Sequence, residues 1–247
     1  MQTRKALMIS AAIAALTMTA PAAQAADAYV SMFGGGSLLE KPGLSGASKT
    51  HTTTYFFQSK QSVDTSFKTG YVLGGNVGVD WGTFRTEVEL GYRHNKSSSK
   101  AHLKTAYQVN VGSFGGYTTW TNSTDKDVAA GLNLSAWSLM ANAWYDFHDV
   151  LPYGITPYVG GGLGFAQVKI SGVLNAVKLR ERDSTVFAWQ LGSGVSIPIT
   201  HSMKLFADYR YFAADSAQLK LLPGFHGGDV KADFDSHSVL FGLRVNL

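Results

Sequence analysis

The stretch Phe84-Arg85-Thr86-Glu87-Val88-Glu89-Leu90-Gly91-Tyr92-Arg93 decides the fold of this chain. Its even positions carry apolar, aromatic or β-branched side chains, and its odd positions carry charged residues or glycine. A β-strand sends alternate side chains to opposite faces, so one face of this strand is apolar and the other is charged. Either the charged face meets water in a soluble sheet, or it lines the interior of a membrane barrel whose apolar face meets lipid. The rest of the chain distinguishes these alternatives.

The composition favours an all-β chain with sparse charge. Of the 247 residues, 45% are hydrophobic and only 15% are charged, and there are 27 glycines, 11 tyrosines and 14 phenylalanines. The absence of cysteine excludes a disulfide framework and thiol chemistry. The formal net charge is +4, but the basic residues do not cluster along the chain, which argues against a nucleic-acid partner.

Residues 1–25 have the three-part pattern of a secretory signal peptide. Arg4 and Lys5 precede an alanine-rich apolar stretch, and Ala23-Gln24-Ala25 offers small residues at the positions that a signal peptidase recognises. We expect 1–25 to be a signal peptide cleaved after Ala25 and 26–247 to be one barrel domain; the alternative is an N-terminal helix of the mature fold. Without Arg4 and Lys5, the chain has 19 basic and 17 acidic residues, which gives a net charge of +2. No later window offers about 18 consecutive apolar residues, so no transmembrane helix is predicted.

Alternating patterns predict eight strands separated by connections that are alternately long and short. The predicted strands cover residues 29–36, 71–80, 84–93, 133–147, 157–170, 185–197, 203–212 and 238–247, and the long connections cover 37–69, 95–132, 171–183 and 213–236. The first long connection is either a polar loop or an extension of the flanking strands. A soluble sandwich does not require this alternation, whereas an up-and-down membrane barrel with short periplasmic turns and long extracellular loops produces it. The predicted fold is therefore an all-β, eight-stranded antiparallel transmembrane barrel.

The charged side chains all fall on the less apolar faces of these strands. Five are acids and four are arginines: Asp80, Arg85, Glu87, Glu89, Arg93, Asp146, Asp208, Arg210 and Arg244. With Lys204 included, five positive charges would match five negative ones. An eight-stranded barrel is narrow enough for side chains to fill it, and a balanced network can satisfy its own hydrogen bonds there. We predict that these nine residues form an interior polar network, which is either structural or pore-lining.

Aromatic residues lie on the apolar faces near the predicted strand ends, where the interfacial girdles of a membrane barrel would need them: Tyr71, Phe84, Tyr92, Tyr145, Phe147, Phe187, Trp189, Tyr209 and Tyr211. Packing in the core of a soluble protein is the alternative for these side chains. Their placement alone does not separate the two.

Three stretches, Phe84–Arg93, Leu139–Phe147 and Pro157–Ala166, carry a resemblance to a known group. The mature chain resembles the small eight-stranded outer-membrane barrels of Gram-negative bacteria, in the outer-membrane protein A-like and surface-antigen superfamily. The resemblance implies location in the bacterial outer membrane and a role as a structural protein, surface antigen, adhesin or minor pore. One departure is the final residue, Leu247, where such barrels usually carry an aromatic residue that the assembly machinery recognises.

Catalytic and metal chemistry find little support in the chain. The seven histidines show no compact metal-ligand spacing. His237-Ser238 invites comparison with lipid A-modifying barrels, but neighbours in a strand point to opposite faces, so His237 is poorly placed to activate Ser238. Glu87 and Glu89 share a face with arginines, which favours an ion-pair network over paired catalytic carboxylates. No catalytic residue, cofactor or metal is predicted.

We therefore expect a monomeric, non-enzymatic outer-membrane barrel with a structural and surface-exposed, antigen- or adhesin-like role. The expected partners are outer-membrane lipid and lipopolysaccharide, the outer-membrane assembly machinery and an extracellular ligand bound through the loops. A small pore for ions or solutes is the alternative function, and a lipid A-modifying enzyme is the less favoured one. The pore and the structural barrel differ in whether the lumen conducts.

Overall fold

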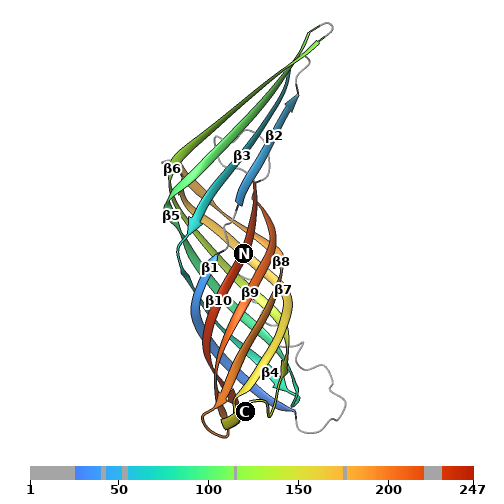
Figure 1. The fold of residues 1–247 in the computed structure, drawn as a ribbon, viewed down its shortest axis with the longest axis vertical. Helices are drawn as coiled ribbons and strands as arrows, with labels where there is room; N and C mark the ends of the chain where they lie inside the picture. The colour runs from blue at the N-terminus through green and yellow to red at the C-terminus, as the bar shows by residue number, and fades with distance from the viewer. Residues whose placement is uncertain (1–25, 40–42, 52–54, 114–115, 175–176, 220–229) are drawn as a thin grey trace, which may run out of the picture.

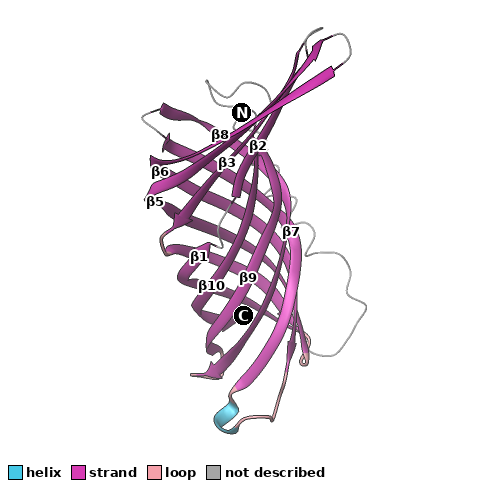
Figure 2. Cartoon of the chain, turned by 45° about the horizontal axis from the view of Figure 1, so that its top comes forward, coloured by secondary structure: helices cyan, strands magenta, loops and turns pink. Residues whose placement is uncertain are grey.

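A computed structural model of the chain describes residues 26–39, 43–51, 55–113, 116–174, 177–219 and 230–247. The predicted signal peptide, 1–25, lies outside these residues. Nearly all of the described chain is strand: β1 (Asp27–Leu39), β2 (Gly43–His51), β3 (Tyr55–Phe67), β4 (Gly70–Asp80), β5 (Phe84–Ser113), β6 (Gly116–Asp146), β7 (Thr156–Leu174), β8 (Val177–Pro198), β9 (Met203–Leu219) and β10 (Val230–Asn246). A short 3-10 helix, η1 (Pro152–Gly154), lies in the turn between β6 and β7 (Figure 2).

Eight of these strands close into an antiparallel barrel. The order around the wall is β1, β4, β5, β6, β7, β8, β9 and β10, and β10 pairs with β1 to complete the ring (Figure 1). The closing seam runs from Tyr29 opposite Asn246 to Leu39 opposite Ser236. Closure removes the unpaired sheet edges that a bilayer does not tolerate. The predicted eight-stranded up-and-down transmembrane barrel is confirmed.

The long connections differ from the expectation of loops, because much of each is strand. β5 and β6 continue past the barrel wall and pair with each other as far as Ser113 opposite Gly116. The segment 37–69 contributes the hairpin β2–β3, in which β3 pairs with the outer half of β5 and β2 touches the outer end of β10. Among their many polar residues these ranges carry threonines and aromatic residues, which favour strands, and pairing satisfies backbone groups that a loop would leave to water. The result is a four-stranded sheet, β2–β3–β5–β6, that projects beyond the barrel (Figure 1).

The opposite end of the barrel has short turns, as predicted. In the turn between β4 and β5, the Gly82 N–H donates to Asp80 Oδ1 at 2.9 Å, and the Trp81 N–H donates to the Phe84 carbonyl at 2.8 Å. Gly82 has a φ of +91°, a conformation that a side chain disfavours. Both ends of the described chain lie at this rim, where the Leu247 N–H donates to the Ala28 carbonyl.

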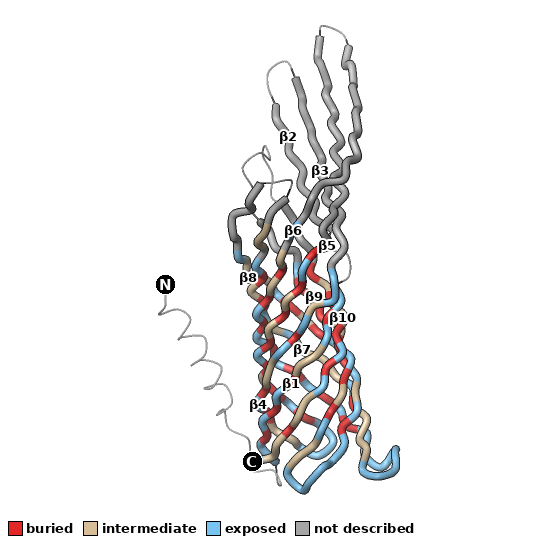
Figure 3. The backbone as a smooth tube through the Cα atoms, turned by 90° about the vertical axis from the view of Figure 1, so that its left-hand side faces the viewer, coloured by how far each residue is buried: buried red, intermediate tan, exposed pale blue. Residues whose placement is uncertain are grey.

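Burial alternates residue by residue along each barrel strand (Figure 3). Large apolar side chains point away from the barrel and are exposed, for example Leu90 at 50%, Leu163 at 60% and Phe241 at 65%. Their neighbours in sequence point inward and are buried. This pattern is inside out relative to a soluble sheet, because the apolar surface lies on the outer wall where lipid covers it. Among the described residues, no helix has the length and apolar character needed to cross a bilayer.

Candidate functional site

The lumen is the candidate site, because the strand alternation directs the predicted charged residues into it. Eight of the nine are buried there, each with at most 5% of its surface exposed: Arg85, Glu87, Glu89, Arg93, Asp146, Asp208, Arg210 and Arg244. The ninth, Asp80, is partly exposed at the turn end, where its carboxylate lies 4.0 Å from Lys204 Nζ. Four buried arginines thus face four buried carboxylates, so the inner wall is formally neutral.

Nearest the turn end, Arg85 and Asp146 form a bidentate ion pair. Arg85 Nε donates to Asp146 Oδ2 at 2.7 Å, and the second guanidinium nitrogen donates to Oδ1 at 2.8 Å. The two residues come from the adjacent strands β5 and β6, so strand register alone brings them together. The Arg85 guanidinium also lies 4.9 Å from the centre of the Tyr158 ring. Two parallel charge-assisted hydrogen bonds make this one of the stronger kinds of contact available to a buried pair.

Glu87 is held by three neutral donors. Tyr29 Oη donates at 2.9 Å, Asn142 Nδ2 at 3.0 Å and Trp144 Nε1 at 2.9 Å. These donors come from β1 and β6, the strands that neighbour or nearly neighbour β5 in the wall. These three hydrogen bonds satisfy a buried carboxylate that has no arginine in direct contact among the described residues.

Glu89 and Arg210 connect opposite walls of the barrel. Arg210, on β9, donates to Glu89 Oε2 and also to Asp208 Oδ2, the latter at 3.0 Å. Glu89 Oε2 further accepts from Asn142 Nδ2 at 3.0 Å. Tyr158 Oη donates to Asp208 at 3.2 Å. Because β5 and β9 are not neighbours in the wall, the Glu89–Arg210 contact crosses the lumen itself.

Arg93 and Arg244 form no ion pair with a residue whose side chain the structure describes. The Arg93 guanidinium instead lies 3.8 Å from the centre of the Phe212 ring and donates to Ser138 Oγ at 2.8 Å. The Arg244 guanidinium lies 4.9 Å from the Tyr29 ring centre. A cation over an aromatic face is attracted by about 2 kcal/mol or more when the pair is desolvated.

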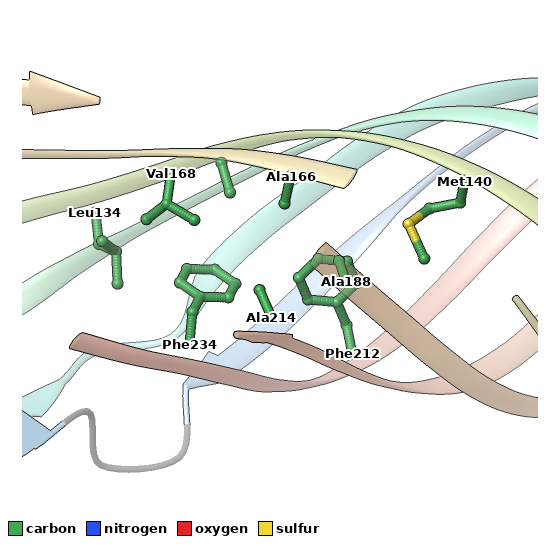
Figure 4. Packing of buried hydrophobic residues seen from close by; sticks show 9 residues of the cluster. Leu134, Met140, Ala166, Val168, Ala188, Phe212, Ala214 and Phe234 are labelled. Atoms are coloured by element: carbon green, nitrogen blue, oxygen red, sulfur yellow. The ribbon is translucent and has the colours of Figure 1, made fainter. Parts of the chain in front are cut away.

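An apolar cluster fills the lumen beyond Arg93, on the side of the projecting sheet. Side chains from five strands converge there (Figure 4): Leu134, Ala136, Met140, Ala166, Val168, Ala188, Phe212, Ala214 and Phe234. The Phe212 and Phe234 rings meet edge to face, with centroids 5.8 Å apart. The polar network is therefore covered by packed hydrocarbon at its outer end.

The nine aromatic residues predicted for the outer girdles are exposed or half-buried on the outer face. A second set of aromatic residues, which the sequence did not single out, lies inside the barrel, where several receive the arginines: Tyr29, Phe33, Trp144, Tyr158, Phe206, Phe212 and Phe234. For Trp144, Phe206 and Phe212 the signal was parity within the strand, because each lies two residues from a charged residue that faces inward. Phe206, for example, precedes Asp208 and Arg210 at the same parity.

The glycines of β7 accommodate the large side chains of β6. A Cβ on Gly160 would lie 2.7 Å from the Trp144 ring, and one on Gly164 would lie 2.9 Å from Met140 Sδ. On Gly162 it would collide with the Asn142 amide, which donates to both Glu87 and Glu89. The glycines therefore leave the space in which the polar network is built.

His237 and Ser238 occupy opposite faces of β10. Ser238 points into the barrel and is 2% exposed, whereas the His237 ring lies outside, with its Nδ1 2.5 Å from Tyr209 Oη. The distance and orientation that a His–Ser catalytic pair needs are therefore not met by these two residues. Among the described residues, no three His, Cys, Asp or Glu side chains gather in a way that would hold a metal ion.

Comparison with known proteins gives this barrel its family. A model of the surface antigen family matches residues 39–237, which is most of the chain. The chain belongs to the surface antigen family. With the outward apolar wall, this membership locates it in the outer membrane of a Gram-negative bacterium, as predicted.

Several known proteins are similar to this surface antigen at modest sequence identity. An uncharacterised protein of Brucella abortus (strain 2308) is 28% identical over 210 residues, which cover 73% of this chain and 70% of that protein. Outer membrane protein PagN of Salmonella typhimurium is 28% identical over 105 residues, covering 39% of this chain and 41% of PagN. The crystal structure of Neisserial surface protein A has 18% sequence identity and a TM-score of 0.46, covering 89% of this chain and 97% of that one.

Proposed function

We propose that this surface antigen is a closed barrel that holds the β2–β3–β5–β6 sheet outside the cell, where the sheet recognises an extracellular partner. The observation that carries the proposal is the contrast between the two halves of the molecule. The barrel interior is occupied by mutually bonded side chains, whereas β5 and β6 continue well past the wall that the membrane requires and are joined there by the hairpin β2–β3. Strands longer than a bilayer crossing serve no need of membrane insertion.

The edges of the projecting sheet support recognition by strand pairing. Within the described residues, β6 pairs with β7 only as far as Ala130, and its outer part, 116–129, pairs with β5 alone. At the other edge, β2 pairs with β10 only through 44–46. An unpaired edge presents a row of backbone donors and acceptors to which an extended peptide can add as a further strand. The expected partner is therefore an extended protein segment at a cell or matrix surface.

A small pore is the competing function, and the filled lumen argues against it. A water path would have to pass the Glu89–Arg210 contact and then the apolar cluster at Phe212 and Phe234. Opening the first would separate buried charges, which is costly, and the second offers water no hydrogen bonds. A lipid A-modifying activity has no support from His237 and Ser238, which face apart.

Removal of the projecting sheet tests the proposal. In one variant, residues 43–67 and 98–130 are each replaced by a short Gly/Ser turn, and in a control only the turn 148–154 at the opposite rim is shortened. Each protein is displayed on a non-adherent laboratory strain, and attachment to cultured epithelial cells and to surfaces coated with matrix protein is counted. Heat-modifiable migration in detergent gels verifies that each barrel has folded.

We expect the intact protein and the turn control to confer attachment, and the sheet-deleted barrel to lose it while remaining folded. Equal attachment by the sheet-deleted barrel would show that the sheet is not the recognition element. The lumen is tested separately in planar bilayers, where the intact protein should give no stable current steps. Steady steps altered by Arg85→Ala or Glu89→Ala would instead establish the pore.

A further inference from the structure

A polar groove lies on the outer wall of the barrel, on the side of the projecting sheet. It has a volume of about 770 Å³, within the range of small-ligand sites, and crosses β5, β6, β7 and β8. The residues that line it alternate with the buried lumen residues, so they face outward; they include Tyr92, His94, Lys96, Trp137, Lys169 and Asp183. The groove is thus separate from the lumen network.

The height of the groove follows from the geometry of β5. Its outward positions are apolar, aromatic or threonine from Phe84 to Tyr92, and then change to His94 and Lys96. At about 3.4 Å per residue and a tilt of about 40°, Tyr92 stands about 21 Å above Phe84 along the barrel axis. Lys96 is then about 31 Å above Phe84, beyond an apolar band of about 25 Å. The groove therefore has its floor in the aromatic girdle and its mouth at the level of lipid headgroups.

Two lysines lie opposite each other beside β5: Lys96, which lines the groove, and Lys68, which lies in the link between β3 and β4. The Lys68 N–H donates to the Lys96 carbonyl at 2.8 Å, which sets the two residues directly opposite each other, and both side chains are exposed. Like charges directly opposite on a sheet repel. Among the residues whose side chains the structure describes, neither lysine has an acidic partner within ion-pair distance. An anion between the two ammonium groups would turn this repulsion into attraction.

Lys169, the other lysine that lines the groove, does have an acidic residue opposite it. Lys169 lies opposite Asp183 across β7 and β8, and the Asp183 carboxylate also accepts from Gln167 Nε2 at 3.0 Å. The groove therefore carries a compensated charge on its β7–β8 side and an uncompensated one on its β5 side, at Lys96. This asymmetry places the attraction for an anion at Lys68 and Lys96.

The floor of the groove is held rigidly by aromatic and polar contacts. The Tyr92 and Trp137 rings lie 4.7 Å apart, and the Tyr71 and His94 rings lie 5.5 Å apart. His94 Nδ1 is 2.9 Å from Ser135 Oγ. Rings with an apolar body and a polar edge suit the boundary between acyl chains and headgroups.

We propose that this groove binds the phosphorylated sugar headgroup of lipid A in the outer leaflet, with a phosphate between Lys68 and Lys96. The sugar lies over the Tyr92–Trp137 floor, and the acyl chains continue down the apolar wall. The charge, the aromatic floor and the height each match one part of such a lipid. A soluble acidic ligand would match the lysines but would gain nothing from a site whose floor opens onto hydrocarbon.

Binding of defined lipids to the delipidated, folded full-length protein tests this assignment. Bisphosphorylated lipid A, enzymatically dephosphorylated lipid A and inorganic phosphate are titrated separately in detergent, and complexes are counted by native mass spectrometry. The variant is the double substitution Lys68→Gln with Lys96→Gln. The matched control is Lys204→Gln, the same change at the opposite rim. Heat-modifiable migration verifies folding of each protein.

We expect the double variant to bind lipid A about thirtyfold more weakly, because each lysine near an anionic headgroup contributes about 1 kcal/mol and 1.4 kcal/mol is tenfold. The single variant Lys96→Gln should lose about fivefold, which keeps the test available if the double variant folds poorly. Dephosphorylated lipid A should bind the intact protein as weakly as lipid A binds the double variant. Equal binding of the two lipids, an equal loss in Lys204→Gln, or inorganic phosphate binding as tightly as lipid A would each overturn the assignment.

Discussion

Breaking the Arg85–Asp146 pair should destabilise the barrel far more than replacing the pair with apolar side chains. Both residues are almost fully buried, and two charge-assisted hydrogen bonds join them at 2.7 and 2.8 Å. At about 1.5–3 kcal/mol for each bond to a charged group, Asp146→Asn should lower the free energy of unfolding by about 3–5 kcal/mol, the range measured when a buried pair loses one partner. Arg85 would remain in the lumen without a carboxylate.

The double variant Arg85→Met with Asp146→Leu should recover most of that loss. Neither charge is then left buried and unpaired, and such replacements are often neutral or stabilising by about 1–4 kcal/mol. The measurement is urea unfolding in lipid vesicles followed by tryptophan fluorescence, with Lys204→Met as a control. Lys204 is partly exposed and 4.0 Å from Asp80, so its loss should change stability by no more than about 1 kcal/mol.

The reasoning fails on either of two results from this cycle. If Asp146→Asn stays within about 1 kcal/mol of the parent, the pair is not desolvated and water reaches the lumen at this level. If the double variant is as unstable as Asp146→Asn, the charges serve packing or folding in a way that apolar side chains of similar volume do not replace. Both results would also weaken the proposal that the lumen is closed.

Three further perturbations probe other parts of the barrel. Gly162→Ala should lower unfolding free energy by about 1–3 kcal/mol in the same urea assay, because its Cβ meets the Asn142 amide; unchanged stability would mean that the network rearranges freely. Ala141→Arg, on the outer wall opposite Val88 and midway along the part of β6 that lies in the barrel wall, should cost about 2–4 kcal/mol in lipid vesicles, while Thr185→Arg at the rim should cost at most about 1 kcal/mol; equal costs would contradict the assigned membrane level. Phe234→Ser should introduce transient currents in planar bilayers if the apolar cluster seals the lumen, and a silent variant would move the seal to the charged layer below.

The sequence predicted which side chains face the inside and the outside of the barrel, because this depends only on the local geometry of each strand. The nine charged residues share parity within their strands, and eight of them are buried in the structure. The same parity predicted that His237 and Ser238 would face apart. The prediction was wrong for 95–132, whose polar composition was interpreted as a loop. This segment is largely the outer half of β5 and β6, because backbone pairing between the two neighbouring strands outweighs its polar composition.

The sequence alone could not predict which lumen residues bond to each other. Arg85 and Asp146 are 61 residues apart, and Glu89 and Arg210 are 121 apart. Arg85 and Asp146 meet through the register of β5 against β6, whereas Glu89 and Arg210 meet only because the closure of β10 against β1 brings β9 opposite β5. The aromatic faces that receive Arg93 and Arg244 depend on the same stagger.

The sequence by itself determined the number of strands in the barrel wall, the lipid-facing surface and the charge balance of the interior. These follow from a side-chain period of two and from the cost of charge in hydrocarbon, both of which act residue by residue. Only the tertiary structure decided the pairing of Arg85 with Asp146, the apolar cluster at Phe212 and Phe234, and the meeting of Lys68 with Lys96 on the outer wall. The two pairs depend on the register between neighbouring strands, and the apolar cluster depends on the relative stagger of five strands, which barrel closure sets; no single strand encodes either property.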